Sequence, residues 1–502
     1  MRNLLALIGM FVVTSAGLGI AACSSTTTVA PTTGTDGGTD GSVVKVDSGS
    51  KLDGSTGADS GPAAGSSCAL AIDLAFATQT DGVLDAVGKS IYYKLAVKKG
   101  DFLSISTDTA ATNTDQPGDV VDTALMLYDA AGKTLLATND DAFPRFTTDS
   151  DLWYRPTADA TLCLQVTDFD TWKGTTPQLA GDNAYKVTAL SLAAGNFDTA
   201  AITQDTEPNE TIATAKAVSL KPYTTPPGGF NILMGDLKDQ ADVDTYKVTL
   251  PAGTEIMTVA IPPIGAPVKS GSNTYGSTLP RFTATIKNAA GTILGELVPP
   301  GAPDTEKMSD SLSMPITPGD IYITISRPAG FAAAANDFYV TTVSVSKYRA
   351  DIKAETETLG GATNNTIATA EVLTMTPDPG NAKLKRTGFR AFLPTGDAMD
   401  NFSFPVTSGD KLSLFCSSAR DGSGIAQFKV DLIQGGTSLQ SETETALADI
   451  GWYTSTNPDA KASKPEVKIA ATGTATLQLS GGTRSATNTG VYYFCSVSLL
   501  AP

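Results

Sequence analysis

The feature that most constrains this fold is an alternation of apolar and polar residues that recurs three times. It lies at residues 93–100 (YKLAVKKG), 246–253 (YKVTLPAG) and 402–409 (FSFPVTSG). An aromatic residue and two further apolar residues take every second position, which is the period of a half-buried β-strand, and a glycine suits the turn that follows. An apolar segment follows each turn, so we predict a repeated hairpin whose second strands lie at 102–105, 256–261 and 412–415.

Other repeated segments indicate that three equivalent units follow one another. Residues 209–218 and 364–373 are identical at six of ten positions (NETIATAKAV and NNTIATAEVL). Each unit has a strand–turn–strand pattern around glycine, at 125–136, 282–294 and 428–439, and closes on an apolar strand near Val187, Val343 or Val497. A chain of 502 residues is too long for one hydrophobic core. We predict an all-β protein with three tandem antiparallel β-sandwich (jelly-roll-like) domains, at 67–196, 204–348 and 354–502.

Short motifs in these units resemble the bacterial pre-peptidase C-terminal domain family. The middle unit has Glu207-Pro208-Asn209 and the run DVDTY at 242–246, and the first unit has DTALMLYD at 122–129 followed by Asn139-Asp140-Asp141. The family consists of small jelly-roll-like modules on secreted peptidases and surface proteins. The resemblance therefore implies accessory, non-catalytic modules, and we find no catalytic domain beside them.

The motifs are not uniform across the units. The first unit lacks the Glu-Pro-Asn opening and has Ile91 where Asp244 would fall. The third unit keeps Asp400 but has Ala398 in place of Asp242. The resemblance is therefore strongest in the middle unit.

The N-terminus predicts export and anchoring. Residues 1–22 have Arg2, an apolar run at 4–13 and small residues at the end, as in a secretory signal peptide. The following Cys23 completes a sequence (IAAC) that resembles the bacterial lipobox, in which this cysteine carries lipid chains such as palmitate. Each buried methylene contributes ~0.8 kcal/mol, so two or three chains would anchor the protein in a membrane.

The next segment indicates how far from the membrane the domains stand. Residues 23–66 are rich in Thr, Gly, Ser and Asp, so we expect a disordered tether with a typical end-to-end distance of about 35 Å. Ser24 is not the aspartate that in many bacterial lipoproteins signals inner-membrane retention. The expected location is the cell envelope, at the outer membrane or cell surface.

Composition excludes several classes of function. The formal net charge of −17 argues against nucleic acid as a partner, since binding it requires clustered Lys and Arg. No histidine occurs, which removes the commonest general base and metal ligand. We therefore expect no enzyme. A hydrolase that works with carboxylates alone is the remaining catalytic alternative, and no facing pair of acids is evident in the sequence.

Four cysteines remain after Cys23, and an even number in an exported chain suggests disulfides. Four cysteines allow three connectivities. Their division between two predicted domains favours Cys68–Cys163 and Cys416–Cys495 over the other pairings, and four buried free thiols are the alternative.

Two sets of residues are candidate binding sites. Asp119, Asp122, Asn139, Asp140 and Asp141 would meet at neighbouring strand ends and could bind Ca²⁺, although such residues also occur in loops simply to cap turns. Asp242 and Asp244 are a weaker calcium candidate, because the other units do not preserve the pair. Trp153, Trp172 and Trp452 could form a stacking platform for sugars or peptides, with packing in the core or at its rim as the alternative.

Together these features predict a membrane-anchored envelope lipoprotein that presents non-catalytic β-sandwich modules for binding or adhesion. The ligand would be a polysaccharide, an envelope component or an extracellular protein, bound by loops at the ends of the sandwiches. The alternative is a structural spacer, or an accessory subunit of a secreted peptidase, without a ligand of its own.

Overall fold

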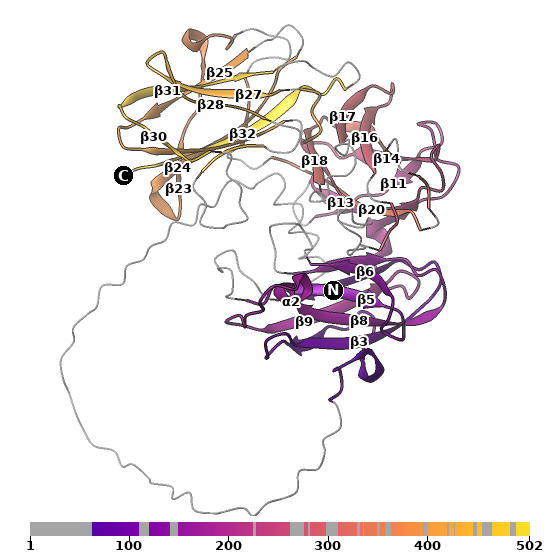
Figure 1. The fold of residues 1–502 in the computed structure, drawn as a ribbon. Coiled ribbons are helices and arrows are strands. Elements are labelled where there is room, and N and C mark those ends of the chain that lie inside the picture. The colour runs from indigo at the N-terminus through magenta and orange to yellow at the C-terminus, as the bar shows by residue number, and fades with distance from the viewer. Residues whose placement is uncertain are drawn as a thin grey trace, which may run out of the picture.

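The computed structural model describes most of the chain after the tether. The described residues are 63–109, 120–140, 149–223, 227–261, 276–279, 282–297, 310–328, 332–334, 336–348, 352–356, 363–394, 399–418, 421–425, 427–444, 449–453, 464–481 and 488–502. They fold into three successive units, each a pair of stacked β-sheets (Figure 1). Among these residues, no helix is both long enough and apolar enough to cross a membrane. The signal segment, Cys23 and the tether lie outside the described residues.

Nine strands are described in the first unit. One sheet has the order β1 (Ile72–Asp73), β3 (Ser90–Val97), β8 (Ala160–Asp168), β5 (Thr123–Tyr128) and β6 (Leu135–Asn139). The other has β2 (Thr80–Val83), β9 (Ala184–Ser191), β4 (Leu103–Asp108) and β7 (Asp151–Tyr154). The turn η1 (Cys68–Leu70) precedes β1, and the short helix α2 (Phe169–Lys173) follows β8.

The middle unit repeats this arrangement with additional edge strands. Its first sheet has the order β10 (Ile202–Gln204), β13 (Gly229–Asp236), β20 (Phe338–Ser346), β15 (Ile256–Ile261) and β18 (Asp310–Pro315), and β12 (Lys221–Pro222) also pairs with β13. The second sheet has β11 (Lys216–Val218), β14 (Val243–Leu250), β19 (Gly319–Ser326), β16 (Thr283–Asn288) and β17 (Ile293–Leu297). The turn η2 (Thr199–Ala201) leads into β10.

The third unit has the same order again. One sheet is β21 (Ile352–Ala354), β24 (Asn381–Phe392), β32 (Tyr492–Leu500), β26 (Lys411–Ser417) and β29 (Ile450–Trp452), with β23 (Thr376–Asp378) on β24 and β30 (Val467–Lys468) on β26. The other is β22 (Glu371–Val372), β25 (Met399–Val406), β31 (Gly473–Ser480), β27 (Lys429–Gln434) and β28 (Thr437–Thr443). The turn η3 (Ile367–Thr369) precedes β22.

The predicted all-β sandwich class is confirmed, and its physical basis is the alternation noted in the sequence. On β14, Tyr246, Val248 and Leu250 are buried while Thr249 between them is exposed. The same face of each sheet thus supplies a row of apolar side chains, and two such rows meet in the core. Most strand pairs are antiparallel, but short parallel pairs occur at sheet edges, as between β11 and β14 or between β10 and β13.

The predicted repeated hairpin is wrong, although its strands exist. β3 and β4 lie in opposite sheets of the first unit, and so do β14 and β15 in the middle unit and β25 and β26 in the third. Alternation identifies which face of a strand is buried, but it does not tell which of two facing sheets the strand joins. The second predicted pair in each unit is a true hairpin, formed by β5 with β6, β16 with β17, and β27 with β28.

Both predicted disulfides are confirmed. Cys68–Cys163 joins η1 to the central strand β8, and Cys416–Cys495 joins the neighbouring strands β26 and β32. Disulfides persist in oxidising compartments, so both bonds agree with an exported protein.

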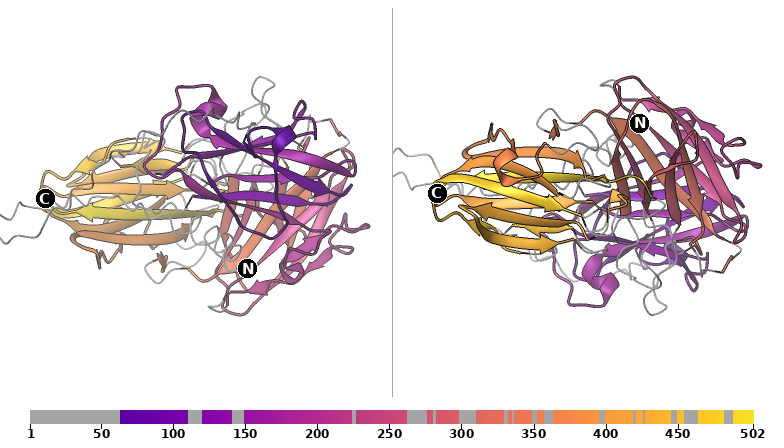
Figure 2. Two further views of the ribbon diagram at one scale, coloured as in Figure 1. Left: turned by 90° about the horizontal axis from the view of Figure 1, so that it is seen from below. Right: turned by 90° about the horizontal axis from the view of Figure 1, so that it is seen from above.

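The units contact one another through apolar side chains as well as hydrogen bonds. Phe102 and Trp153 of the first unit and Tyr492 of the third all belong to the buried cluster of the middle unit. Arg155 forms an ion pair with Asp236, which joins the first and middle units. Both views in Figure 2 show the third unit, in orange to yellow, extending to one side of the other two.

Candidate metal centre in the middle unit

Three acidic side chains converge where the chain enters the middle unit. Asp205 follows β10, Glu207 stands two residues later, and Asp244 is the second residue of β14. One carboxylate oxygen from each lies within 4.8 Å of the others. Among the described residues this is the one group of three or more acids or cysteines close enough to share a metal ion.

Asp244 is the innermost member of the group. Its side chain is fully buried, and burial raises its pKa to about 8, although a hydrogen bond from Tyr339 lowers it in part. The Tyr339 hydroxyl donates to Asp244 Oδ2 at 2.5 Å. The Tyr246 hydroxyl lies 2.5 Å from that of Tyr339, so it completes a relay of buried hydroxyls from one sheet to the other.

The ionised forms of the neighbouring acids are also destabilised. Burial, and next the charge of Glu207, raises the pKa of Asp205 to about 6. The pKa of Asp242 is raised as well, chiefly by burial. The Lys238 ammonium lies 2.7 Å from Glu207 Oε1 on the solvent side and offsets only part of this negative charge. A cation between the three carboxylates would stabilise their ionised forms.

Two buried oxygens in this centre lack a hydrogen-bond donor. They are Asp244 Oδ1 and Asn209 Oδ1, and both residues are fully buried. The Asn209 amide nitrogen donates to Asp205 Oδ1, which places the asparagine among the acids. An unpaired buried acceptor is costly, and a bound cation removes that cost. The residues present therefore fit a metal ion with oxygen ligands.

The backbone around the centre is held in place by two local features. A Cβ at Gly235 would lie 2.4 Å from the Tyr339 hydroxyl and 2.8 Å from Asp205 Cβ, so only glycine lets both side chains approach β13. The buried Arg327 guanidinium pairs with Asp337 at 2.5 Å and donates to the carbonyl of Leu237. It thereby holds the loop that carries Lys238 and Asp242.

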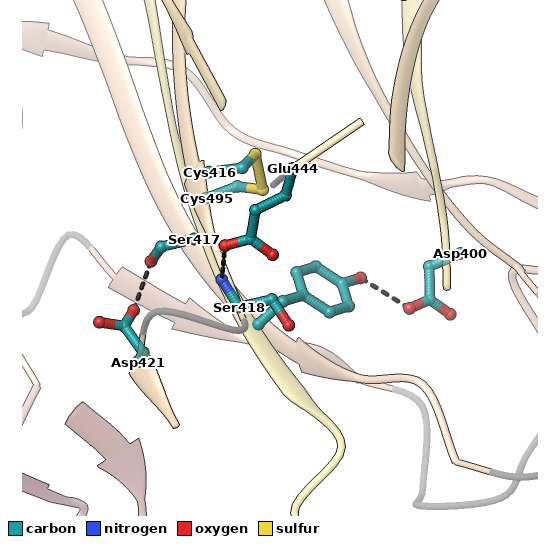
Figure 3. The surroundings of a disulfide bond; sticks show 8 residues. Asp400, Cys416, Ser417, Ser418, Asp421, Glu444 and Cys495 are labelled. Atoms are coloured by element: carbon teal, nitrogen blue, oxygen red, sulfur yellow. Dashed lines mark hydrogen bonds between the residues drawn. A yellow bond between two sulfur atoms is a disulfide. The ribbon is translucent and has the colours of Figure 1, made fainter. Parts of the chain in front are cut away.

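The equivalent positions of the third unit keep part of this arrangement. Tyr493 donates to Asp400 at 2.6 Å, as Tyr339 does to Asp244, and Figure 3 shows this bond in the same region as the Cys416–Cys495 disulfide. The Asn364 amide donates to Glu355 at 2.7 Å. In the first unit the paired hydroxyls of Tyr93 and Tyr185 persist at 3.0 Å, but Ile91 replaces the aspartate.

The calcium site predicted in the first unit stays a prediction. Asp119 and Asp141 lie outside the described residues. Asp122 and Asp140 flank β5 and β6 at the same end of the hairpin, as expected. The Asn139 side chain donates to the Asp151 carbonyl of β7 and accepts from the Asp140 amide at 3.0 Å.

The proposed tryptophan platform is wrong for two of its three members. Trp452 is fully buried and donates to Glu442 at 2.6 Å. Trp153 is also buried, where it stacks on Phe197 at the junction of the first and middle units. Both rings fill apolar space between elements, which is the packing alternative. Trp172 on α2 is partly exposed, with Lys173 Nζ 4.7 Å from its ring centre and its indole N–H donated to Thr138.

The sequence motifs contain two of the three acids of the metal centre, Glu207 and Asp244, but not the third. The Glu207-Pro208-Asn209 and Asp242-Val243-Asp244 motifs were both visible, yet they are more than thirty residues apart. Asp205 was missed. The usable signal was an acid that directly follows the short segment Ile202–Gln204, two positions before the Glu-Pro-Asn motif.

Comparison with known proteins gives no family assignment. No protein-family description matches the sequence, and no curated protein matches it. The fold is similar to the pre-peptidase C-terminal domain of a collagenase from Bacillus anthracis, at 14% identity over 24% of this chain and 93% of that one, with a TM-score of 0.18.

Two other solved structures are similar to parts of the chain. PliG, a periplasmic inhibitor of g-type lysozyme from Salmonella Typhimurium, is 17% identical over 26% of this chain and 98% of its own, with a TM-score of 0.17. The tandem CBM51 modules of a family 98 glycoside hydrolase from Streptococcus pneumoniae are 12% identical over 55% of this chain and 84% of theirs, with a TM-score of 0.15. At these identities and TM-scores the likenesses say nothing about a ligand or an activity.

Proposed function

We propose that the chain is an envelope-exposed, non-catalytic binding protein whose middle unit requires Ca²⁺ for its functional geometry. The observation that carries the calcium requirement is the fully buried Asp244, which has one oxygen without a donor and lies within 4.8 Å of Asp205 and Glu207 oxygens.

The donor set favours calcium over other common metals. It consists of carboxylate oxygens with one amide oxygen, from Asn209, nearby. Ca²⁺ takes six to eight oxygen ligands in flexible geometry, whereas Mg²⁺ demands a near-ideal octahedron and keeps several waters. Zinc prefers histidine and thiolate, and the centre offers neither.

The position of the centre explains what calcium would do for binding. Asp205 and Glu207 belong to the segment between β10 and β11 of the middle unit, whereas Asp244 belongs to β14 in the other sheet. The nearby Asp236 pairs with Arg155 of the first unit. An ion at this place would fix the β10–β11 segment against β14, beside the Asp236–Arg155 contact, and so make the surface on which the first unit rests more rigid. Loops of both units would then be presented to a ligand in one arrangement, at a lower entropic cost of binding.

The proposal includes lipid anchoring at Cys23 and a polysaccharide, an envelope component or an extracellular protein as ligand. It is supported by the lipobox-like sequence, the two disulfides and the sandwich modules, whose end loops vary without disturbing the core. Metabolic labelling with a palmitate analogue tests the anchor, because Cys23→Ser should abolish incorporation into the full chain.

The binding role is tested by capture of the full chain, carrying Cys23→Ser, on peptidoglycan, insoluble polysaccharides and envelope preparations. We expect capture in Ca²⁺, weaker capture in chelator, and loss of the calcium effect in Asp244→Asn. Asp320→Asn is the matched control, since Asp320 is an exposed acid paired with Lys247 away from the centre. No capture in either buffer would contradict the binding role and favour the spacer alternative.

A further inference from the structure

In the part of the chain that the structure describes, the first unit has a sheet edge without a partner strand, and the equivalent edge is covered in both other units. In the middle unit, β13 has β20 on one side and both β10 and β12 on the other. In the third unit, β24 likewise has β32 on one side and both β21 and β23 on the other. The equivalent strand of the first unit is β2, and within the described residues it pairs with β9 alone.

The equivalence of these strands is fixed by their partners. Gly82 of β2 lies opposite Tyr185 of β9, as Gly235 of β13 lies opposite Tyr339 of β20. Asp81 therefore corresponds to Met234, and in the third unit to Arg390, which precedes Ala391 opposite Tyr493.

The parallel strands that cover this edge in the other two units, β10 and β21, are each followed by the same backbone hydrogen bond. The amide of Asp205 donates to the Met234 carbonyl at 2.7 Å, and the amide of Glu355 donates to the Arg390 carbonyl at 2.9 Å. In each case an acidic residue directly follows a three-residue parallel strand. The corresponding acceptor in the first unit is the carbonyl of Asp81. Along an antiparallel strand, the backbone groups of successive residues point alternately toward and away from the neighbouring strand. The Leu84 amide points toward β9, where it donates to Asn183. Asp81 is an odd number of residues away from Leu84, so its carbonyl points away from β9.

The order of the chain in the other two units places the corresponding strand of the first unit before residue 65. The carbonyls of Asn209 and Asn364, which follow the covering strands, accept from Thr245 of β14 at 2.9 Å and Asn401 of β25 at 3.0 Å. In the first unit Gly65 accepts from Tyr92 of β3 at 2.9 Å and so takes the same place. The strand that would precede it falls in the tether.

One stretch of the tether has the required sequence. Residues 43–46 (VVKV) are the only place within 23–62 where three aliphatic residues fall within four positions, and Asp47 follows directly. Three four-residue segments share one pattern: Ile202–Asp205 (ITQD), Ile352–Glu355 (IKAE) and Val44–Asp47 (VKVD). Each begins with a β-branched residue, continues with a polar residue and a residue of any type, and ends with an acid. Valine favours an extended strand.

We propose that tether residues 44–46 add to the open edge of β2 as a parallel strand, with the Asp47 amide donating to the Asp81 carbonyl. The connection from Asp47 to Gly65 reaches up to roughly 60 Å when extended, so it is long enough, and the entropic cost of closing a loop grows only slowly with its length. Docking leaves only residues 24–43 as free tether, with a typical reach of about 25 Å. The inference depends on neither calcium nor a ligand.

The experiment is residue-resolved amide hydrogen exchange on the full chain carrying Cys23→Ser, compared with the same chain carrying Lys45→Pro. In parallel pairing, the Asp81 amide donates to the Lys45 carbonyl and the Lys45 amide donates back toward β2, so proline at 45 removes a donor. We expect the Asp81 amide to exchange roughly tenfold faster in Lys45→Pro. The control Thr33→Pro, elsewhere in the tether, should change nothing.

The amides of Met234 and Arg390 are internal controls. They lie on strands that pair with β10 and β21, so they should stay protected from exchange in every variant. Equal and rapid exchange of Asp81 in the parent and in Lys45→Pro would overturn the proposal. Protection that disappears on dilution would also overturn it, since the covering strand would then belong to a second copy of the chain.

Discussion

Asp244 shows how a single buried residue couples protonation, metal binding and stability. Without a cation its pKa is raised to about 8 by burial, and that of Asp205 to about 6. The folded protein therefore holds protons that the unfolded chain releases above its ordinary pKa near 3.8. Without calcium, the stabilising contribution of these groups is complete below pH 3.8 and is lost as the pH rises toward 8.

Calcium affinity should rise with pH for the same reason. Binding requires ionised carboxylates, so the ion must displace the proton of Asp244. Between pH 6 and 7 the affinity should increase by about tenfold for this one proton. Isothermal titration calorimetry in buffers of different ionisation enthalpy would measure both the affinity and the proton release.

Matched variants separate this site from other acids. Asp244→Asn should weaken calcium binding by at least about tenfold and abolish most of the proton release, whereas Asp320→Asn should leave both unchanged. Asp151 in the first unit also has a pKa raised to about 6, so the comparison must be made between calcium-loaded and calcium-free protein. A calcium affinity that does not change with pH would contradict the assignment of Asp244 as a ligand.

At the scale of elements, two side chains lie so close to β13 that position 235 must be glycine. Gly235→Ala places a methyl group 2.4 Å from the Tyr339 hydroxyl and 2.8 Å from Asp205 Cβ. Because both neighbours are held in place, we expect a loss of about 1–3 kcal/mol in the free energy of unfolding, measured in urea. Gly473→Ala is the control, since its new methyl would meet nothing nearer than Gln434 at 3.9 Å. Equal stability of the two variants would show that Tyr339 moves freely.

The disulfides are a second determinant at this scale. Cys68–Cys163 closes a separation of 95 residues and holds the start of the first unit on the central strand β8. Replacing both cysteines by serine should lower the free energy of unfolding of that unit by up to about 4.5 kcal/mol, because the unfolded chain regains loop entropy. Urea unfolding followed by hydrogen exchange in β8 measures this loss. Unchanged protection of β8 would mean that packing alone holds the unit together.

For the whole molecule, the contact between the middle and third units depends on close backbone approach. The Glu296 amide donates to the Gly422 carbonyl at 2.9 Å, and the Thr489 amide donates to the Ile293 carbonyl at 3.1 Å. These bonds attach two segments of the third unit to β17, which is an edge strand of the middle unit. The pairing protects an edge that would otherwise be open to other chains.

Gly490→Ala should separate these two units. Its methyl would lie 1.7 Å from the Leu294 carbonyl oxygen, and rigid backbone cannot move aside without breaking the contact. We expect a larger radius of gyration by small-angle X-ray scattering and faster proteolysis between the units, with each sandwich still folded. Gly473→Ala again serves as control, and an unchanged radius of gyration would show that other contacts hold the units together.

The sequence by itself determined what depends on near neighbours along the chain. The alternation in 93–97, 246–250 and 402–406 specified strands with one buried face, and three copies of it specified three sandwiches. The distribution of Cys68, Cys163, Cys416 and Cys495 between two units was enough to choose their pairing. Only the tertiary structure decided which sheet each strand joins, because both sheets bury the same kind of face.

Packing also decided whether the tryptophans are buried or exposed and which acids form the metal centre. Nothing near Trp153 or Trp452 in the sequence shows that another element will cover the ring. Asp205 and Asp244 are far apart along the chain, and they meet because β10 and β14 bring their ends together in opposite sheets. Such meetings depend on the register and stacking of whole sheets, and local composition does not encode these in a form that can be read from one sequence.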